Sequence, residues 1–168
     1  MADTEDQVSG QVAGKENETA VKFLIQRVYV KDSSFETPNT PDIFRAAYKP
    51  HIQFNMNTKT NNFDGSMYEV ILTMTAEVKN DDDKVLFIAE VQQAGVFEIE
   101  GLDGENLVQV LNITCPNVLF PYGRESIDNL ANKGSFPSLM LQPVNFESAF
   151  LQAREQQEQK AKLAEADS

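Results

Sequence analysis

One run of residues limits the possible folds of this chain more than any other: residues 85–99, with the sequence VLFIAEVQQAGVFEI. Side chains of a β-strand alternate between two faces, and here both faces carry apolar groups. One predicted face consists of Val85, Phe87, Ala89, Val91 and Gln93. The opposite face consists of Leu86, Ile88, Glu90 and Gln92. The pattern predicts a central strand of a small antiparallel sheet, and because one helix layer covers only one face, it also suggests a docking surface around Ile88 and Glu90.

The length of 168 residues fits one domain with tails. The single cysteine, Cys115, excludes an internal disulfide and favours a reducing compartment, so we expect a cytoplasmic protein. The first residues have neither a basic region nor an apolar run, and no stretch has the length of a membrane span. We predict a disordered acidic tail over residues 1–20, a folded domain over residues 21–153 and a polar, mobile tail over residues 154–168.

The formal net charge of −12 argues against nucleic acid and anionic membranes as partners. It fits either a basic protein partner or simple solubility. The three consecutive aspartates in the turn at residues 80–84 lack the glycine and glutamate spacing of an EF-hand, so they predict a solvated turn.

Four segments are rich in β-branched and aromatic residues and predict strands: residues 21–32, 51–58, 66–79 and 85–99. The first has apolar groups on both faces and is a candidate for pairing at a sheet edge. Residues 33–44 contain Pro38 and Pro41 and predict a long crossover loop, and residues 60–66 predict a turn.

Beyond Gly101 the apolar period becomes helical. The pattern predicts a helix capped by Asp103 and interrupted by Pro116, then a second helix with Pro121 in its first turn and Gly134 at its end. Asn145 is expected to cap a last helix whose apolar face ends after two turns, so the chain should fray from about Glu155.

The residues give little support to catalysis. His51 is the only histidine and lies on a polar strand face, and no glycine-rich phosphate loop is present. Cys115 has no partner for a metal site, so we expect it to be a buried structural thiol. No cofactor is therefore predicted. A small acidic enzyme would need an enclosed cleft with converging polar groups. A purely structural oligomer would instead bury its aromatic side chains.

Four runs, in the same order, resemble the SecB family of bacterial protein-export chaperones: QRVYVKDSSFETPNTPDIF, FIAEVQQAGVFEIEG, CPNVLFPYGRESIDNL and GSFPSLMLQPVNFESAF. The resemblance covers roughly residues 23–151. It implies an α+β fold, a four-stranded antiparallel sheet with helices packed on one face, and a homotetramer built as a dimer of dimers. The strand positions that it implies to face the helix layer of the oligomer are Phe87, Ala89, Val91 and Gln93.

The resemblance also implies two kinds of partner. Asp32, Glu36, Ile88 and Glu90 match positions that the family uses to bind SecA, a translocation ATPase with a basic tail. SecB-like proteins bind extended apolar segments of unfolded precursor proteins without ATP. The candidates for such a client groove are Phe35, Phe44, Tyr48, Phe120, Tyr122, Phe136, Leu139 and Leu141. A SecB-like chaperone of a toxin-antitoxin system would keep this fold and change the client and the partner.

Overall fold

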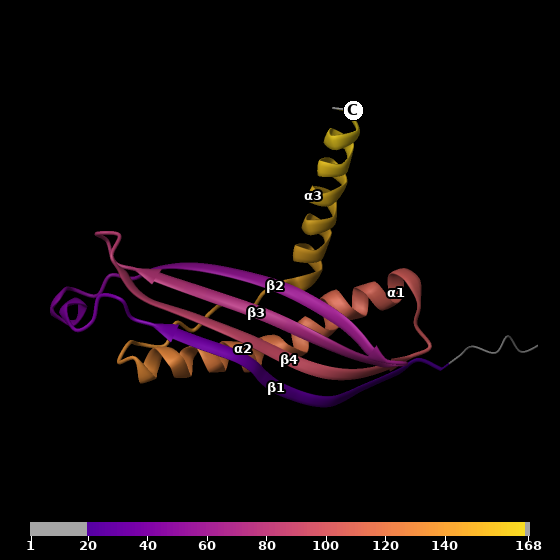
Figure 1. Cartoon of the computed structure of the whole chain (residues 1–168), viewed down its shortest axis with the longest axis horizontal. Helices are drawn as coiled ribbons and strands as arrows, with labels where there is room; N and C mark the ends of the chain where they lie inside the picture. The colour runs from indigo at the N-terminus through magenta and orange to yellow at the C-terminus, as the bar shows by residue number, and fades with distance from the viewer. Residues whose placement is uncertain (1–19, 167–168) are drawn as a thin grey trace, which may run out of the picture.

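A computed structural model describes residues 20–166 of the chain, so the tail predicted for residues 1–20 lies outside the described residues except for its last position. The described part is built around one antiparallel sheet in the order β1-β4-β3-β2. Figure 1 shows α1 and α2 along one face of this sheet. The predicted α+β class, with four strands and helices on one face, is confirmed. The strands are β1 (Lys22–Glu36), β2 (His51–Asp64), β3 (Met67–Lys79) and β4 (Val85–Glu100).

The central position predicted for residues 85–99 is confirmed. β4 pairs with β1 on one side and with β3 on the other, so Val91 lies opposite both Ser33 and Met74. Both of its hydrogen-bonding edges are therefore paired, as expected of a central strand.

Two strands are longer than their sequences predict. Residues 33–36 belong to β1 rather than to the crossover loop, because Phe35 pairs with Ala89 of β4. Most of the turn predicted at residues 60–66 is strand, with Asn61 paired to Glu69 of β3. Asn and Asp have weak strand propensity and Ser favours turns, but hydrogen bonding to a long neighbouring strand overrides these preferences.

The helix layer is continuous where two helices were predicted. α1 (Gly104–Gln109) passes through a π-helical turn (Val110–Thr114) directly into α2 (Cys115–Lys133). The interruption predicted at Pro116 is wrong, because Pro116 lies in the first turn of α2, where its missing N–H is tolerated, after a π-helical turn that changes the hydrogen-bond spacing. Pro121 lies inside α2 rather than in a first turn, and Gly134 ends the helix as predicted.

The core lies between the sheet and α2. Its fully buried side chains come from β3, β4 and α2: Val70, Leu72, Met74, Val78, Phe87, Val91, Phe97, Leu119 and Ile127. Each such side chain contributes about 1.5–3 kcal/mol by leaving water. The apolar face predicted for residues 66–79 is the face that packs against the helix layer.

The last helix, α3 (Phe146–Ala166), begins as predicted. The Ser148 N–H donates to Asn145 Oδ1 at 3.0 Å, which supplies a partner to a backbone donor of the first turn. α3 continues well past residue 155, with the side chains of residues 151–163 exposed, and it projects away from the sheet (Figure 1). The mobility expected for residues 154–168 stays a prediction.

Candidate functional site

The outer face of the sheet, opposite the helices, carries the four predicted SecA-binding residues together. On β1, Asp32 lies opposite Gln92 and Glu36 lies opposite Ile88. Glu90 lies on β4 between Ile88 and Gln92. Asp32 and Glu36 are exposed, and Ile88 and Glu90 are half-buried. We call Asp32, Glu36, Ile88 and Glu90 the outer patch.

A β-bulge places Asp32 in the outer patch. Val30 lies opposite Gln93, whose side chain faces the helices, and the register then shifts so that Asp32, two residues later, lies opposite Gln92. Lys31 is the extra residue on β1. Without this shift Asp32 would face the helix layer, because side chains alternate strictly along a regular strand.

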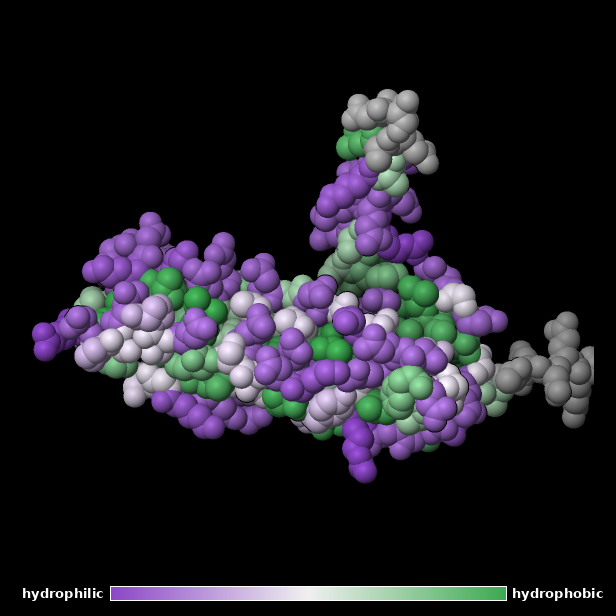
Figure 2. Space-filling model, viewed as in Figure 1, coloured by the Kyte–Doolittle hydropathy of each residue, from purple (hydrophilic) through white to green (hydrophobic). Residues whose placement is uncertain are grey.

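A further carboxylate borders the outer patch and was missed by the sequence reasoning. Glu77 of β3 lies opposite Ile88, so Ile88 stands between Glu36 on one neighbouring strand and Glu77 on the other. Glu90 is held by Thr75, whose Oγ1 donates to Glu90 Oε2 at 2.9 Å. The sequence shows Glu77 only as a solvated strand position. Its place beside Ile88 could be predicted only from the strand register. Figure 2 shows hydrophilic residues over most of the visible face, with small apolar patches between them.

A second polar arrangement on the outer face joins three strands at Glu69 of β3. Glu69 Oε1 accepts from Tyr29 Oη at 2.5 Å and from Lys31 Nζ at 2.6 Å, and Oε2 accepts from Asn61 Nδ2 at 3.2 Å. The hydrogen bond from Lys31, followed by that from Tyr29, lowers the pKa of Glu69. Burial, followed by the hydrogen bond to Glu69, raises the pKa of Tyr29 to about 12.

The strand residues expected to serve the oligomer face a helix layer, but the layer belongs to their own chain. Phe87, Ala89 and Val91 are completely buried and Gln93 is 2% exposed. These four side chains therefore leave no surface for direct contact with a second subunit. Gln93 Nε2 donates to the Tyr29 carbonyl at 3.0 Å, whereas its buried Oε1 has no partner within the described residues.

Four of the predicted client residues gather in what we call the aromatic cluster: Phe35, Phe44, Tyr48 and Phe136. Phe136 is at its centre, with ring centroids 5.4 Å from Phe44 and 6.5 Å from Tyr48. It also packs 4.8 Å from the buried Phe87, which lies 5.4 Å from Phe35. Phe44 and Tyr48 are 51% and 40% exposed, so the cluster rests on the core and still presents two aromatic rings to solvent.

The other client candidates do not join this cluster through aromatic contacts. Phe120 and Leu141 are only 5% and 8% exposed, and Phe120 packs 6.0 Å from Phe146, so both are core residues here rather than groove residues. Tyr122 is exposed on α2, and Leu139 is half-buried in the loop after it. The sequence could not separate these from the cluster, since buried and exposed aromatics look alike in it.

A cleft of about 610 Å³ lies where α3 leaves the body of the molecule, between β2, α1 and α3. Met56, Val108 and Phe150 are among its lining residues. At its rim Arg154 forms an ion pair with Glu105 and lies 5.6 Å from the centre of the Phe150 ring. The apolar face predicted for the last helix is the side of α3 that lines this cleft.

Two further features concern possible chemistry: the environment of Cys115 and the arrangement of potential metal ligands. Cys115 is completely buried, and burial raises the pKa of its thiol to about 12, which confirms the structural thiol expected from the sequence. Within residues 20–166, no three His, Cys, Asp or Glu side chains converge as a metal site would require. No helix of that same range has the length and hydropathy of a membrane span.

An antiparallel sheet with acidic side chains on its open face and exposed aromatic rings beside its helices defines a class of binding protein with open surfaces. Comparison with known proteins gives the family. A family model described as "Preprotein translocase subunit SecB" matches residues 16–157. The chain belongs to the SecB family.

Individual relatives agree with this assignment. "Protein-export protein SecB" of Marinobacter nauticus is 47% identical over 151 residues, covering 90% of this chain and 91% of the relative. Its counterpart of the same name in Pseudomonas paraeruginosa is 49% identical over 139 residues, covering 83% and 85%. A SecB-like chaperone of Mycobacterium tuberculosis, solved in complex with a ChAD peptide from an antitoxin, shares the fold with a TM-score of 0.60 at 15% identity, covering 73% of this chain and 90% of that one.

Proposed function

We propose that this protein is a chaperone of protein export that works in the cytoplasm, binds extended apolar segments of unfolded precursors without ATP, and delivers them to SecA. The observation that carries the proposal is the aromatic cluster, in which Phe44 and Tyr48 remain half exposed on a packed base. Exposed aromatic rings bind apolar segments of many sequences, because dispersion and apolar burial need no sequence code. The names of the close relatives agree with this function.

The holding activity is tested by aggregation of a chemically unfolded precursor diluted into buffer without nucleotide. The protein at near-equimolar ratio should suppress the light scattering of the precursor. Replacing Phe44 and Tyr48 by serine should weaken suppression, while Phe63→Ser should not, since Phe63 is an aromatic of similar exposure, 57%, on β2 outside the cluster. Failure of the unmodified protein to suppress aggregation would remove the chaperone proposal.

We propose that the outer patch binds the basic tail of SecA. Its carboxylates surround the apolar Ile88, so a cationic peptide that also carries an apolar side chain would find both kinds of contact there. The face lies on the side of the sheet opposite the helices, which allows SecA and a client to bind at the same time.

The test is charge reversal. Asp32→Lys together with Glu90→Lys should abolish SecA binding in a titration and leave aggregation suppression intact. The matched control, Asp64→Lys together with Asp82→Lys, changes the net charge equally at exposed positions outside the patch. Equal weakening by both pairs would show a general charge effect and refute the assigned patch.

We also propose that the chain assembles as a dimer of dimers. The supporting observation is the edge strand β1, where Leu24, Ile25 and Val30 are each nearly half exposed. An exposed apolar edge strand is a site for pairing with a second chain. Light scattering should give the mass of four chains, and Val30→Lys should shift the mass downward. A stable monomer in dilute buffer would refute the assembly.

A further inference from the structure

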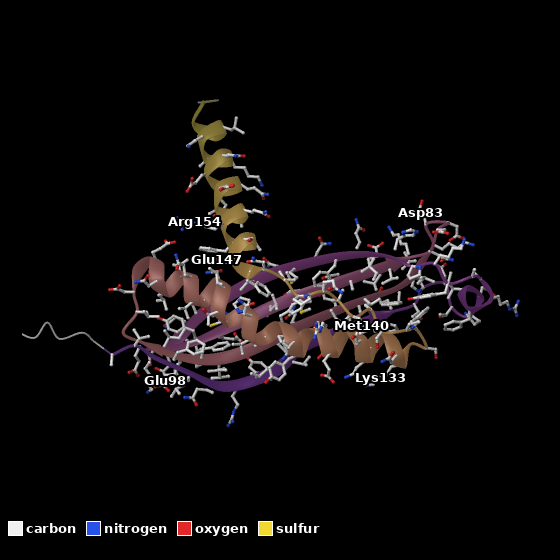
Figure 3. All side chains as sticks on the ribbon, turned by 180° about the vertical axis from the view of Figure 1, so that it is seen from behind. Asp83, Glu98, Lys133, Met140, Glu147 and Arg154 are labelled. Atoms are coloured by element: carbon white, nitrogen blue, oxygen red, sulfur yellow. The ribbon has the colours of Figure 1, made fainter. Side chains whose placement is uncertain are left out.

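The two exposed rings of the aromatic cluster, Phe44 and Tyr48, lie on the segment that links β1 to β2. Residues 47–50 of this segment have no regular secondary structure, so no ladder of the sheet orients the Tyr48 ring. The segment passes the hairpin of residues 80–84, which joins β3 to β4. Figure 3 shows this hairpin, with Asp83 labelled, at the same end of the sheet as the segment. The hairpin is therefore placed to supply the orientation that the sheet does not.

One buried side chain of the hairpin, Asn80, holds the backbone on both sides of Tyr48. Asn80 Nδ2 donates to the Ala47 carbonyl at 3.0 Å, and the Lys49 N–H donates to Asn80 Oδ1 at 2.8 Å. Peptide groups are planar, so only the φ and ψ angles of Tyr48 lie between the two peptide groups that are bonded. The Asn80 amide therefore fixes both backbone angles of Tyr48, and the allowed side-chain rotamers follow from them.

The hairpin itself does not need an amide side chain at this position. The Asn80 N–H donates to the Lys84 carbonyl at 2.9 Å, and the Asp83 N–H donates to the Asn80 carbonyl at 3.0 Å, so backbone groups close the turn. Burying a side-chain amide costs free energy unless its polar groups are paired, and Asn80 is 8% exposed. Both polar groups of the amide are paired with the segment that carries Tyr48, which explains why an asparagine is placed here.

Asp81, the next residue, also contacts this part of the chain, but it is a weaker constraint. Asp81 Oδ2 lies 3.4 Å from Lys49 Nζ, and Asp81 Oδ1 lies 2.6 Å from His51 Nε2. All three side chains are at least half exposed, and exposed ion pairs contribute little to holding two elements together. The buried amide of Asn80 is thus the firmer of the two connections.

We propose that Asn80 is a positioning residue of the client-binding surface: its amide fixes the direction of the Tyr48 ring, and through that ring it sets the affinity for client. This inference rests on the proposed chaperone function. A ring that is already held in place loses less conformational entropy when a client binds. Asn80 lies outside the four runs that resemble the SecB family, so the resemblance does not imply this role.

The first test is Asn80→Ala. Ala47 and Lys49 are exposed, so water can replace the two lost hydrogen bonds, and the melting temperature should fall by at most about 4 °C. Binding of a reduced, carboxymethylated and permanently unfolded protein, measured well below that temperature, should weaken about threefold because the ring is no longer held. Client affinity equal to that of the unmodified protein would overturn the inference.

Asp82→Ala is the matched control within the hairpin. It removes the acceptor of the Lys84 N–H, at 3.3 Å from Asp82 Oδ1, and leaves both contacts of Asn80 in place. This variant should bind the client as tightly as the unmodified protein. Equal weakening by Asp82→Ala and Asn80→Ala would show that any loosening of the hairpin has this effect, and would also overturn the inference.

A double-mutant cycle shows whether Asn80 acts through Tyr48. In a Tyr48→Ser background the ring is absent, so adding Asn80→Ala should weaken client binding no further, although it should still lower the melting temperature to a similar extent. A purely structural role would lower affinity by the same factor in both backgrounds. That result would refute the positioning role.

The contact itself is observed through the Lys49 amide in the full-length protein labelled with ¹⁵N at lysine, with the signal assigned from Lys49→Arg. Its exchange with water should be about fivefold faster in Asn80→Ala and unchanged in Asp82→Ala. Weaker client binding in Asn80→Ala without faster exchange would contradict the mechanism. If the unmodified protein binds no client, the proposed function fails. If it binds client and Asn80→Ala speeds exchange without changing affinity, only the role of Asn80 fails.

Discussion

At the scale of single residues, Glu69 is a carboxylate whose partners come from two other strands. Tyr29 and Lys31 of β1 and Asn61 of β2 all donate to it across the outer face. Hydrogen bonds to a charged acceptor are stronger than neutral ones, so this arrangement ties the edge strands to the centre of the sheet. It also makes the stability of the fold depend on the ionised form of Glu69.

The sign of this dependence follows from the lowered pKa. The folded state favours the charged form of Glu69, so the stabilisation is complete above its ordinary pKa of 4.5 and is lost as the pH falls through the lower pKa of the folded state. The difference in free energy of unfolding between the unmodified protein and Glu69→Gln should therefore shrink as the pH falls from about 7 to about 3. Urea denaturation at one protein concentration measures it. A difference that does not change with pH would contradict the prediction.

Single residues were predicted well where their role is local. The cap at Asn145 and the burial of Cys115 depend on sequence neighbours and on residue type, and both are as expected. Glu77 and the buried Phe120 show the limit, because strand register and helix packing decide their surroundings. Neither is encoded by the residue or by its neighbours in the chain.

At the scale of elements, the contact of α2 with β3 depends on a missing side chain. A Cβ added at Gly123 of α2 would overlap Met74 Sδ and would lie 3.4 Å from the Cβ of Gln93. Both residues are buried, so the surroundings have little room to move. Glycine lowers the helix propensity at this position, and the close approach of the helix to the sheet explains its presence.

Gly123→Ala should lower the free energy of unfolding by about 1–2 kcal/mol, although alanine in an exposed helix position would raise it by about 1 kcal/mol. Because the overlap involves the thioether of Met74, the same change in a Met74→Val background should be neutral or stabilising. Denaturation of the four proteins of this double-mutant cycle gives the coupling energy, expected above about 0.5 kcal/mol. Additive effects would show that Met74 does not oppose the alanine.

Elements were predicted where the apolar period is strong and were misjudged at their ends. Residues 66–79 alternate clearly, residues 85–99 are apolar on both faces, and the two segments form β3 and β4 nearly as expected. Local propensity predicts a loop at residues 33–36, part of a turn at residues 60–64 and a helix break at Pro116. In the fold, contacts with neighbouring elements decide the structure at all three places. Pairing with a long strand and the shift at a π-helical turn arise only when the elements assemble.

At the scale of the whole molecule, charge and apolar surface have opposite consequences. The net charge of −12 makes identical chains repel, whereas the exposed side chains of β1 favour their association. The two proposed partners should therefore be distinguishable by ionic strength. SecA docking uses carboxylates, and assembly uses apolar groups.

Raising the salt concentration from about 10 mM to about 1 M should preserve or strengthen subunit association, because repulsion is screened. The same change should weaken binding of SecA, because attraction at the outer patch is screened as well. Light scattering and a binding titration in the same buffers measure both. Dissociation of the assembly at high salt would show that ion pairs, not apolar contacts, hold the subunits together.

The arrangement of the sheet and helices followed from strand and helix periods together with the family resemblance. The family resemblance also predicted the four residues of the outer patch as a set. It did not predict the bulge at Lys31 that completes the patch. The client residues were predicted only in part. Their distribution between core and surface depends on how the loop at residues 138–141 lies against α2, which the sequence does not show.

The hidden thiol has a practical consequence for experiments. Cys115 is completely enclosed and its thiol stays protonated far above neutral pH, so maleimide dyes should not react with it in the native protein. A cysteine introduced at any exposed position then becomes the sole point of attachment for a fluorophore or spin label, and no preparatory cysteine deletion is needed. Distances within working complexes can thus be recorded on a chain that carries one deliberate change.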